Sequence, residues 1–318
     1  MLHLLNGDAT AAVFARAGLP GESAVWRDVL MEGPVAAGAV TADAMPGRPA
    51  YLAERLAIDP EEYGRASRQN EAALARGAEH DELVLWFEQD LFCAVTLWFV
   101  LARLATRPPA RLSLVFPETS AVKGLGALAP EPLAALFGER RVLDPDALTA
   151  GRAAWDAYAS PTPAAVEQLI RGDAPLPFVA GAARCHLGRL PSTRDGLNEM
   201  ERAVLAALRD GPLAFAPLFT RVTDDEAVRR HGAGDVQVAG TLREMRGGPG
   251  PLVGIERADR APREWTVAIT ETGRDVLDGR ADRMTRSPVD RWVGGVRVAP
   301  GLPAWRWDGR RVRLAHAA

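Results

Sequence analysis

The segment ELVLWFEQDLF, from Glu82 to Phe92, most restricts the fold of this chain. Its centre is a continuous apolar run, which is typical of a strand that is covered on both faces. A second apolar stretch, Leu91 to about Ala105, follows at once and is too short to cross a bilayer. A buried strand that leads directly into a helix favours a parallel sheet with helices on both faces.

The same order of strand and helix recurs over about the first 120 residues. Strands joined by helices imply parallel pairing with right-handed crossovers. We therefore predict an α/β fold whose N-terminal domain, residues 1–120, has an open parallel sheet of the Rossmann-like kind. The predicted strands are Leu2–Leu5, Glu22–Leu30, Leu83–Glu88 and Arg111–Phe116, and the predicted helices are Ala9–Ala17, Ala50–Ala78 with a break near Asp59-Pro60, and Leu91–Ala105.

The rest of the chain changes character twice. Residues 121–194 read as a helical connector. Residues 195–318 read as a winged-helix-like α+β domain with a terminal β-hairpin, because helices are followed by two strand-like segments, 251–258 and 263–270. Asn198 and Glu201 have the spacing of a capping box at the first of these helices. Asp308-Gly309 has the signature of a two-residue type I′ turn in the terminal hairpin.

Length and composition indicate a folded protein with more than one domain. The chain has 318 residues, 47% hydrophobic and 25% charged side chains and a net charge of −3, which are ordinary globular values. Its apolar runs are shorter than a bilayer span, and the N-terminus lacks a basic leader, so we expect a cytoplasmic protein without a membrane partner. Its two cysteines, Cys93 and Cys185, are expected to be reduced thiols in the core.

Carboxylates follow three of the predicted strands. Asp8 follows the first strand, Asp28 and Glu32 the second, and Glu88 and Asp90 the third. Ligands of open parallel sheets bind outside these strand ends, and clustered negative charges there need a cation or a polar ligand. We therefore predict Glu88 and Asp28 as catalytic residues, and Asp8, Glu88 and Asp90 as ligands of Mg²⁺ or Mn²⁺.

Each of these carboxylates also has a structural interpretation. Asp8 and Asp90 precede helices, where Asp is a common N-cap. Asp28, beside an arginine, could be half of a surface ion pair, and Glu32 could shape a turn before Gly-Pro. Glu88 extends an apolar strand directly and could be a buried, hydrogen-bonded carboxylate.

The loop Asn6-Gly7-Asp8 joins the first strand to the first helix. Gly7 would let the backbone approach an anion, and the helix would offer free N–H groups. The loop lacks the further glycines of a dinucleotide-binding loop and the Gly-Lys-Thr/Ser of a phosphate loop. We predict that Asn6, Gly7, Asp8, Thr10, Trp26 and Glu32 bind a small polar or phosphorylated ligand.

The charge pattern of the C-terminal domain does not favour nucleic-acid binding. Arg243 and Arg246 on its third predicted helix could meet phosphates, as could arginines in the wing. Neighbouring acidic residues such as Glu244 nearly cancel them, whereas a DNA-binding surface concentrates positive charge. The basic terminal segment around Trp305 and Trp307 reads as a hairpin whose tryptophans pack on the domain.

Three segments, LHLLNGD, WRDVLMEGP and ELVLWFEQDLF, in this order and spacing, resemble the bacterial family called domain of unknown function 1835. The segments HLGRLPSTRDGLNEMERAVLAAL and DRWVGGVRV…WRWDGRR look like the region that commonly follows that domain. The family has no established reaction, so the resemblance points to residues rather than to an activity. These residues are Asn6, Gly7, Asp8, Trp26, Asp28, Glu32, Gly33, Pro34, Glu88, Asp90 and Phe92.

The chain departs from the family's pattern in two places. Relatives often have Ser after Asn-Gly-Asp, where this chain has Ala9, so a hydroxyl nucleophile is missing at that position. Relatives also tend to have polar residues after Asp-Leu-Phe, where this chain has Cys93-Ala94-Val95. A ligand site at this position would therefore be lined in part by apolar residues.

The sequence thus favours an α/β domain that binds a small polar or phosphorylated ligand, with metal-assisted hydrolysis or phosphoryl chemistry if the protein is an enzyme. Two alternatives stay open. One is a ligand-sensing, transcription-related regulator whose winged helix contacts DNA. The other is a non-catalytic interaction protein.

Overall fold

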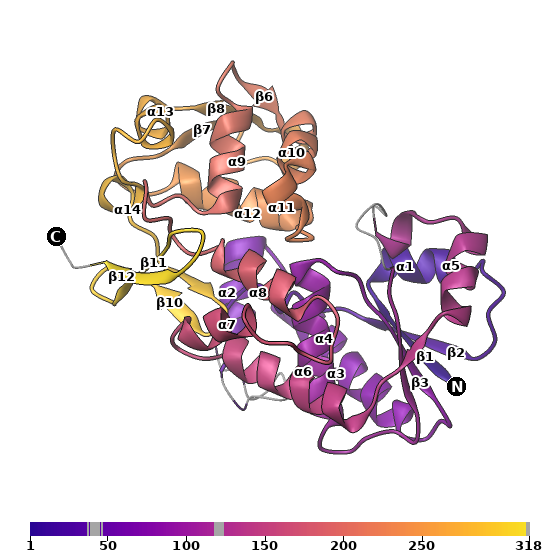
Figure 1. Ribbon diagram of the computed structural model, residues 1–318. Helices are drawn as coiled ribbons and strands as arrows, with labels where there is room; N and C mark the ends of the chain where they lie inside the picture. Colours follow the sequence, from indigo (N-terminus) through magenta and orange to yellow (C-terminus); the bar gives the residue numbers. More distant parts are fainter. Residues whose placement is uncertain (37, 39–44, 46, 118–123, 316–318) are drawn as a thin grey trace.

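Figure 1 shows a computed structural model of the chain, which describes residues 1–36, 38, 45, 47–117 and 124–315. The predicted boundary between residues 120 and 121 lies outside the described residues. Among the helices within these ranges, none has both the length and the apolar character that a membrane span requires.

A five-stranded sheet forms the centre of the N-terminal part, in the order β2-β1-β3-β4-β5. The first four strands pair in parallel, and the short β5 runs antiparallel to β4. The predicted α/β fold and the parallel pairing of its four predicted strands are therefore confirmed, whereas the antiparallel β5 was not predicted. The strands are β1 (Leu2–Asn6), β2 (Glu22–Trp26), β3 (Leu83–Trp86), β4 (Leu112–Val115) and β5 (Arg141–Val142).

Two strands end earlier than the sequence indicated. The second was predicted to reach Leu30 but ends at Trp26. Beyond it, the Arg27 N–H donates to Asn70 Oδ1 at 3.1 Å, and Asn70 Nδ2 donates to the Arg27 carbonyl at 3.1 Å. A side chain from a helix thus replaces the strand partner. The third strand ends at Trp86, two residues before Glu88.

Helices cover both faces of the sheet. Phe14 and Leu133 pack with Leu5 and Trp86 on one face, and the other face belongs to a larger core that includes Leu85. This two-sided burial explains why the strands read as continuous apolar runs. The helices of this part are α1 (Asp8–Phe14), α2 (Arg48–Leu56), α3 (Pro60–Gly77), α4 (Leu91–Leu104), α5 (Pro130–Gly138) and α6 (Pro145–Tyr158).

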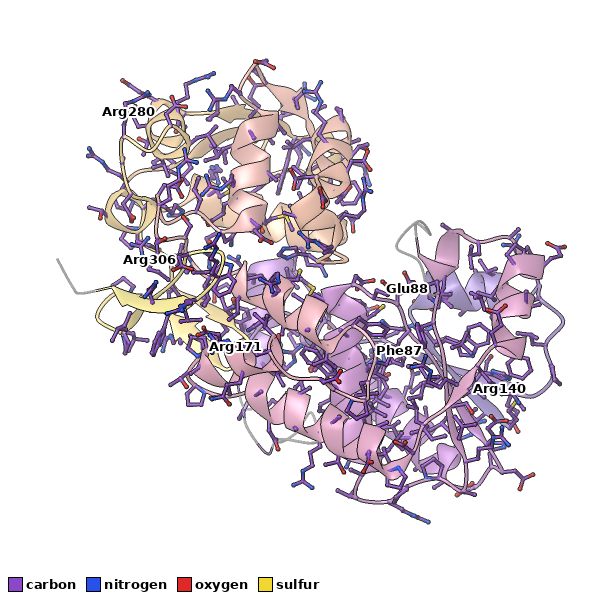
Figure 2. All side chains as sticks on the ribbon, viewed as in Figure 1. Phe87, Glu88, Arg140, Arg171, Arg280 and Arg306 are labelled. Carbon is purple, nitrogen blue, oxygen red and sulfur yellow. The ribbon has the colours of Figure 1, made fainter. Side chains whose placement is uncertain are left out.

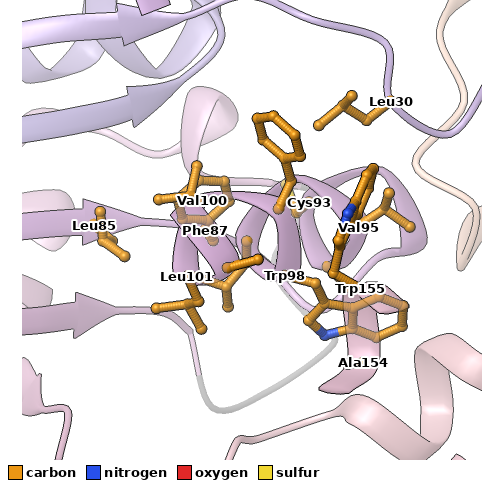
Figure 3. Packing of buried hydrophobic residues seen from close by; sticks show 14 of the residues in the cluster. Leu30, Leu85, Phe87, Cys93, Val95, Trp98, Val100, Leu101, Ala154 and Trp155 are labelled. Carbon is orange, nitrogen blue, oxygen red and sulfur yellow. The ribbon is translucent and has the colours of Figure 1, made fainter. Parts of the chain in front are cut away.

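Helix α4 is buried along almost its whole length. All its residues except Phe92 and Arg103 are buried, and Figure 3 shows part of the core around it. It packs closely on α6 at Gly151, where a Cβ atom would lie 2.5 Å from the Cβ of Leu101. The small residue therefore permits the helix crossing.

The predicted helical connector is not purely helical. Its strand β5 joins the main sheet, and its helices α5 and α6 pack on the sheet's two sides. A strand of two exposed residues, Arg141-Val142, carries no apolar periodicity that would identify it. The remaining elements of this region are η2 (Leu125–Ala127), α7 (Ala164–Leu169) and α8 (Val179–Leu187).

The C-terminal part has its own core and a small antiparallel sheet in the order β6-β8-β7. Asn198 and Glu201 form the predicted capping box of α9, and β7 and β8 form the predicted pair. The elements are α9 (Glu199–Ala207), β6 (Leu213–Ala214), α10 (Phe215–Asp224), α11 (Glu226–Arg229), α12 (Asp235–Arg246), β7 (Val253–Glu256), η3 (Pro262–Glu264), β8 (Thr266–Ile269), α13 (Glu271–Leu277) and α14 (Arg283–Arg286).

Two hairpins end the chain: β9 (Arg291–Val293) with β10 (Val296–Val298), and β11 (Ala304–Trp307) with β12 (Val312–Ala315). The prediction of a two-residue turn at Asp308-Gly309 is wrong. Trp307 pairs with Val312, so the turn comprises residues 308–311. The Asp308 carboxylate accepts the backbone N–H groups of residues 310 and 311 and thereby stabilises this longer turn.

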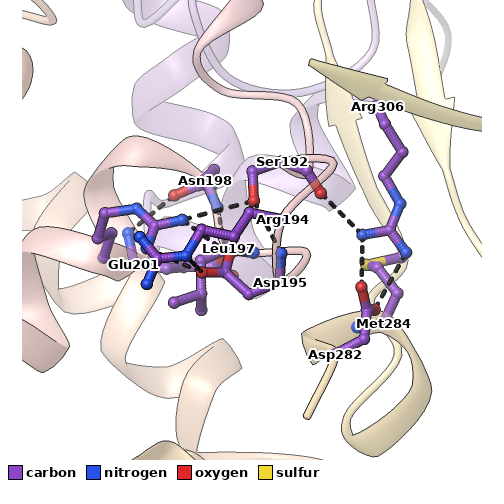
Figure 4. A network of polar contacts seen from close by, with 10 residues as sticks. Ser192, Arg194, Asp195, Leu197, Asn198, Glu201, Asp282, Met284 and Arg306 are labelled. Atoms are coloured by element: carbon purple, nitrogen blue, oxygen red, sulfur yellow. Dashed lines mark hydrogen bonds and ion pairs between the residues drawn. The ribbon is translucent and has the colours of Figure 1, made fainter. Parts of the chain in front are cut away.

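The segment that leads into α9 is held by a polar network, shown in Figure 4. The Ser192 hydroxyl donates to Asp195 Oδ1 at 2.7 Å, and the Leu197 N–H donates to the same oxygen at 3.1 Å. Arg306, from β11, donates to the Ser192 carbonyl at 3.0 Å and pairs with Asp282 at 2.9 Å. The last hairpin therefore fixes the entry to the C-terminal part.

A buried ionic network joins the C-terminal part to α2. Arg291 Nη1 donates to Glu201 at 2.9 Å and to Glu244 at 2.8 Å, and Glu244 also pairs with Arg55 of α2. Burial opposes the ionisation of Glu201, but Arg291 and Arg283 outweigh it and lower the pKa of Glu201 to about 2. These buried charges neutralise one another only when the two parts are docked as observed. They therefore favour one relative arrangement of the parts.

The close crossing of α4 and α6 predicts opposite effects of Gly→Ala changes in two helices. Gly151→Ala places a methyl group against Leu101 and is expected to destabilise the protein by about 1–3 kcal/mol, as overpacking does. Gly181→Ala in α8 meets open space and is expected to stabilise by about 0.5–1 kcal/mol. Urea unfolding of both variants measures the difference, and equal effects would contradict the described crossing.

Candidate functional site

The candidate site lies where the two central strands, β1 and β3, end. From β1 the chain continues through α1 to β2 on one side, and from β3 it continues through α4 to β4 on the other. In open α/β sheets, ligands bind at such a switch point, outside the carboxyl ends of the strands. Asn6 ends β1, and Glu88 and Asp90 follow β3, so these predicted residues lie at the switch point.

Asn6 and Cys93 link the end of β1 to the first turn of α4. Asn6 Nδ2 donates to Cys93 Sγ at 3.1 Å, while Asn6 Oδ1 is buried and has no hydrogen-bond partner among the described residues. An unpaired buried acceptor is costly unless a water or a ligand donates to it. Burial and then the charges of Asp90 and Glu88 raise the pKa of Cys93, so its thiol stays protonated. A water or a ligand that donates a hydrogen bond to Asn6 Oδ1 would therefore remove this cost.

Glu88, labelled in Figure 2, follows β3, and its carboxylate contacts Gly124 and Leu125. Its Oε1 accepts the Leu125 N–H at 2.8 Å, and a Cβ at Gly124 would lie 3.0 Å from Oε2. Burial, with a smaller effect from the nearby Asp90, raises the pKa of Glu88 to about 7. The described residues give this carboxylate no ion pair.

Asp90 is the N-cap of α4, as one of its interpretations predicted. Its Oδ1 accepts the Cys93 N–H at 2.8 Å. A Cβ at Gly232 would lie 2.3 Å from the same oxygen, so the C-terminal part covers this carboxylate. Burial raises the pKa of Asp90, while the hydrogen bonds of the cap oppose that rise. The N-terminus of α4 is thus buried at the junction of the two parts.

Asp8 does not point into this site. Its side chain is 68% exposed and pairs with Arg27, whose Nε donates to Asp8 Oδ2 at 2.9 Å. Hydrogen bonds from Arg27 lower the pKa of Asp8. The interpretation of Asp8 as an N-cap is also wrong, because Gly7 is the N-cap of α1 and Asp8 is the first helical residue. Gly7 has φ of +92°, a conformation that favours glycine.

Asp28 forms a buried ion pair rather than the surface pair that its neighbour suggested. Arg48, whose side chain is fully buried, donates to Asp28 Oδ1 at 2.9 Å and to Tyr63 Oη at 2.9 Å. It also donates to the backbone carbonyls of Val29 and Glu32. One guanidinium group therefore fixes the loop after β2, and Asp28 balances its charge.

Glu32 is buried in a second ion pair, with Arg189 at 2.8 Å. Arg189 follows α8 and also donates to the Met31 carbonyl. Glu32 and Arg189 line a polar cavity of about 30 Å³ between the N-terminal and C-terminal parts. Glu32 thus belongs to the junction of the parts rather than to the ends of β1 and β3.

Thr10 and Trp26 are both buried, at 3% and 2% exposure. The Trp26 indole N–H has no hydrogen-bond partner among the described residues, and it lies beside a cavity of about 10 Å³ that Asp28 also lines. Such a cavity has room for about one water molecule. Trp26 is therefore part of the core beneath the loop that Arg48 fixes.

The structure distributes the predicted site residues over separate environments. Glu88, Asp90 and Asn6 are at the switch point, whereas Asp8, Asp28 and Glu32 are each paired with an arginine. Asp8, Glu88 and Asp90 do not form a three-ligand group among the described residues. Sequence reasoning missed Arg48 and Arg189, which have no motif and come from distant positions in the chain.

The fold and this site define an α/β protein whose open sheet carries a desolvated carboxyl group at its switch point. No protein-family model matches the chain, and no curated protein matches its sequence. The resemblance to domain of unknown function 1835 stays a prediction.

Glu88→Gln is expected to stabilise the protein at alkaline pH. Native Glu88 releases its proton near pH 7, but an ordinary Glu does so near pH 4.5. The native state therefore holds more protons in this window, and stability falls as pH rises through it. At ~1.4 kcal/mol per pKa unit, the variant should gain up to about 3 kcal/mol at pH 8 and none at pH 4. Urea unfolding at both pH values measures this.

Asp28→Asn is the matched comparison, because it also replaces a predicted catalytic acid by its amide. It leaves buried Arg48 without a counter-charge, so we expect a loss of about 3–5 kcal/mol at pH 8. A Glu88→Gln protein that is less stable than the parent at pH 8 would show that the native Glu88 carboxylate is well solvated or paired.

Proposed function

We propose that the α/β domain binds a small polar ligand at the ends of β1 and β3, and that Glu88 exchanges a proton with it. One observation carries this proposal: a half-buried carboxyl group and a buried amide oxygen without a donor, Asn6 Oδ1, lie at the same switch point. Unpaired polar groups of this kind are uncommon in cores and gather at functional sites.

Glu88 has the environment of a general acid or base. A carboxyl group with a pKa near 7 is populated in both protonation states at neutral pH, which suits proton transfer. Asn6 Oδ1 would accept a hydrogen bond from a ligand hydroxyl or amine and so orient it. If the protein is an enzyme, hydrolysis in which Glu88 activates a water is the reaction class that this arrangement supports best.

A metal-assisted or phosphoryl reaction is the second form of this proposal. Two carboxylates, Glu88 and Asp90, would suffice for Mg²⁺ or Mn²⁺ when waters or a substrate phosphate complete the shell. Asp90 already caps α4, and Asp8, Asp28 and Glu32 are paired with arginines. A neutral polar ligand is therefore favoured over a metal-bound phosphorylated one.

A thermal-shift screen at pH 7 tests the proposal with nucleosides, sugars, amino compounds and phosphate monoesters, each with and without Mg²⁺. A true ligand at 100 times its Kd should stabilise the parent protein by about 2.7 kcal/mol. Asn6→Ala and Glu88→Gln should weaken its binding at least about tenfold, which corresponds to ~1.4 kcal/mol.

Asp8→Asn is the control in this screen, since Asp8 is exposed and paired with Arg27. It should bind the selected compound like the parent. A compound that binds equally to the parent, Asn6→Ala and Glu88→Gln proteins would place the ligand elsewhere. A panel in which nothing binds the parent would count against a small-molecule function.

We propose in addition that residues 195–318 contain a winged-helix-like module that serves as a docking domain. The order α9-β6-α10-α11-α12-β7-β8, with β8 between β6 and β7, supports the winged-helix assignment. In DNA-binding modules of this kind the third long helix enters the major groove, so it must be exposed. In α12, however, residues 237–242 are all buried, and a Cβ at Gly240 would lie 2.9 Å from the Arg55 carbonyl oxygen.

We therefore expect no salt-dependent binding to duplex DNA. Phosphate contacts give an affinity that falls steeply between about 50 and 200 mM salt, and α12 is covered by α2. Fluorescence anisotropy with a labelled nonspecific duplex at both salt concentrations measures this. Tight binding at 50 mM salt that is lost at 200 mM would restore the regulator hypothesis and would require α12 to leave α2.

A further inference from the structure

Three potential metal ligands from distant parts of the chain lie close together near the N-terminus of α4. Cys185 belongs to α8, Glu199 is the first residue of α9, and His231 lies between α11 and α12. Their ligand atoms, one from each side chain, all lie within 4.8 Å of one another, and His231 Nε2 is 3.0 Å from Glu199 Oε2. Within the described ranges they are the one such group of three.

We propose that Cys185, Glu199 and His231 form a binding site for a divalent cation of the Zn²⁺ class. Thiolate, imidazole and carboxylate are the ligands that Zn²⁺ takes, at about 2.0–2.3 Å. Ligand atoms around a tetrahedral ion at these distances are roughly 3.3–3.8 Å apart. The observed spacing needs only small side-chain adjustments to reach this arrangement.

The charge of the group suits this kind of ion. Burial and then Glu199 raise the pKa of the Cys185 thiol, so without a cation it keeps its proton. When the ion binds, the thiol releases that proton to solvent and a sulfur–metal bond replaces the S–H bond. A 2+ ion with one thiolate, one carboxylate and one neutral imidazole has no net charge, which reduces the cost of burial.

Two backbone features hold the ligands in place. A Cβ at Gly188 would lie 2.3 Å from Glu199 Cδ, so glycine at this position lets the carboxylate fold back toward α8. The His231 carbonyl accepts the Phe92 N–H at 3.2 Å and its N–H donates to the Val228 carbonyl at 2.8 Å. The backbone of His231 is therefore fixed from both sides.

One of the three residues, His231, borders a cavity that could hold a water molecule. His231 also lines the polar cavity of about 30 Å³ between the two parts of the chain. This volume exceeds the roughly 10–15 Å³ that one water needs. A water held in this cavity beside His231 could complete the coordination of an ion that has three protein ligands.

Cobalt titration of the full, chelator-stripped chain at pH 8 tests the proposal, because a thiolate bound to Co²⁺ gives a charge-transfer absorption band. We expect this band to saturate at one Co²⁺ per chain, to disappear when one equivalent of Zn²⁺ is added, and to be unaffected by Mg²⁺. No band in the parent protein, together with no Zn²⁺ retained after gel filtration, would overturn the proposal.

The variants separate the ligands from other residues. Cys185→Ser should abolish the band, whereas Cys93→Ser, which replaces the other buried thiol, should keep it; the reverse result would overturn the assignment. Glu199→Gln and Gly188→Ala leave Cys185 intact and should weaken Co²⁺ binding at least about tenfold. They keep the test decisive if Cys185→Ser fails to fold, which a melting curve without metal reveals.

Two controls complete the design. Gly181→Ala, in the same helix as Cys185 but facing open space, should bind Co²⁺ like the parent. Glu88→Gln should also keep the site, since Glu88 is not among its ligands. If the parent, Glu199→Gln and Gly188→Ala proteins bound Co²⁺ with equal affinity, the three residues would not form a metal site. They would then be only a buried thiol beside a His231–Glu199 hydrogen bond.

Discussion

The burial of α4 is the constraint on which the rest of the structure depends. A helix that is apolar almost all round cannot lie at a surface, because its exposed area would be costly in water. The sheet covers one side of it, and α6 and α8 cover others, with Gly151 permitting a close crossing with α6. The position of its first turn follows from this packing, so the Glu88–Asp90 segment that precedes it is partly buried as well.

Buried arginines organise the polar interior around this core. Arg48 and Arg189 each donate to backbone carbonyls of the loop after β2 and to one of its carboxylates. Arg291 joins α9 and α12 by pairing with one carboxylate from each helix, Glu201 and Glu244. Such pairs contribute little net stability when compared with apolar residues, but removal of one partner leaves a charge that is expensive to bury. They therefore define loop and domain positions, and their carboxylates are not free to bind ligands.

The sheet could be predicted from the sequence because the patterns that indicate strands and helices are local. Continuous apolar runs, the Asn198–Glu201 box and the alternation of strand and helix can each be read within about ten residues. The environment of each predicted site residue instead depended on pairing with residues far away in the chain. The rule that ligands bind at strand ends placed Asp8, Asp28, Glu32 and Glu88 near one edge, but it could not say which would meet an arginine. The partner of Glu32, Arg189, lies 157 residues further along the chain.

Glu88 and Asp90 differ from Asp8, Asp28 and Glu32 because burial raises their pKa values and neither has an ion pair among the described residues. The Glu88 carboxylate meets Gly124 and Leu125, while Asp90, which raises its pKa, is covered by Gly232 of the C-terminal part. The main-chain N–H groups of Leu91 and Phe92 donate to the carbonyls of residues 230 and 231. The C-terminal part therefore affects Glu88 indirectly, because it covers Asp90, whose charge contributes to the raised pKa of Glu88. The contact of α12 with α2 lies at the same junction, so the helix that would read DNA in a winged helix is covered by the part that carries Glu88.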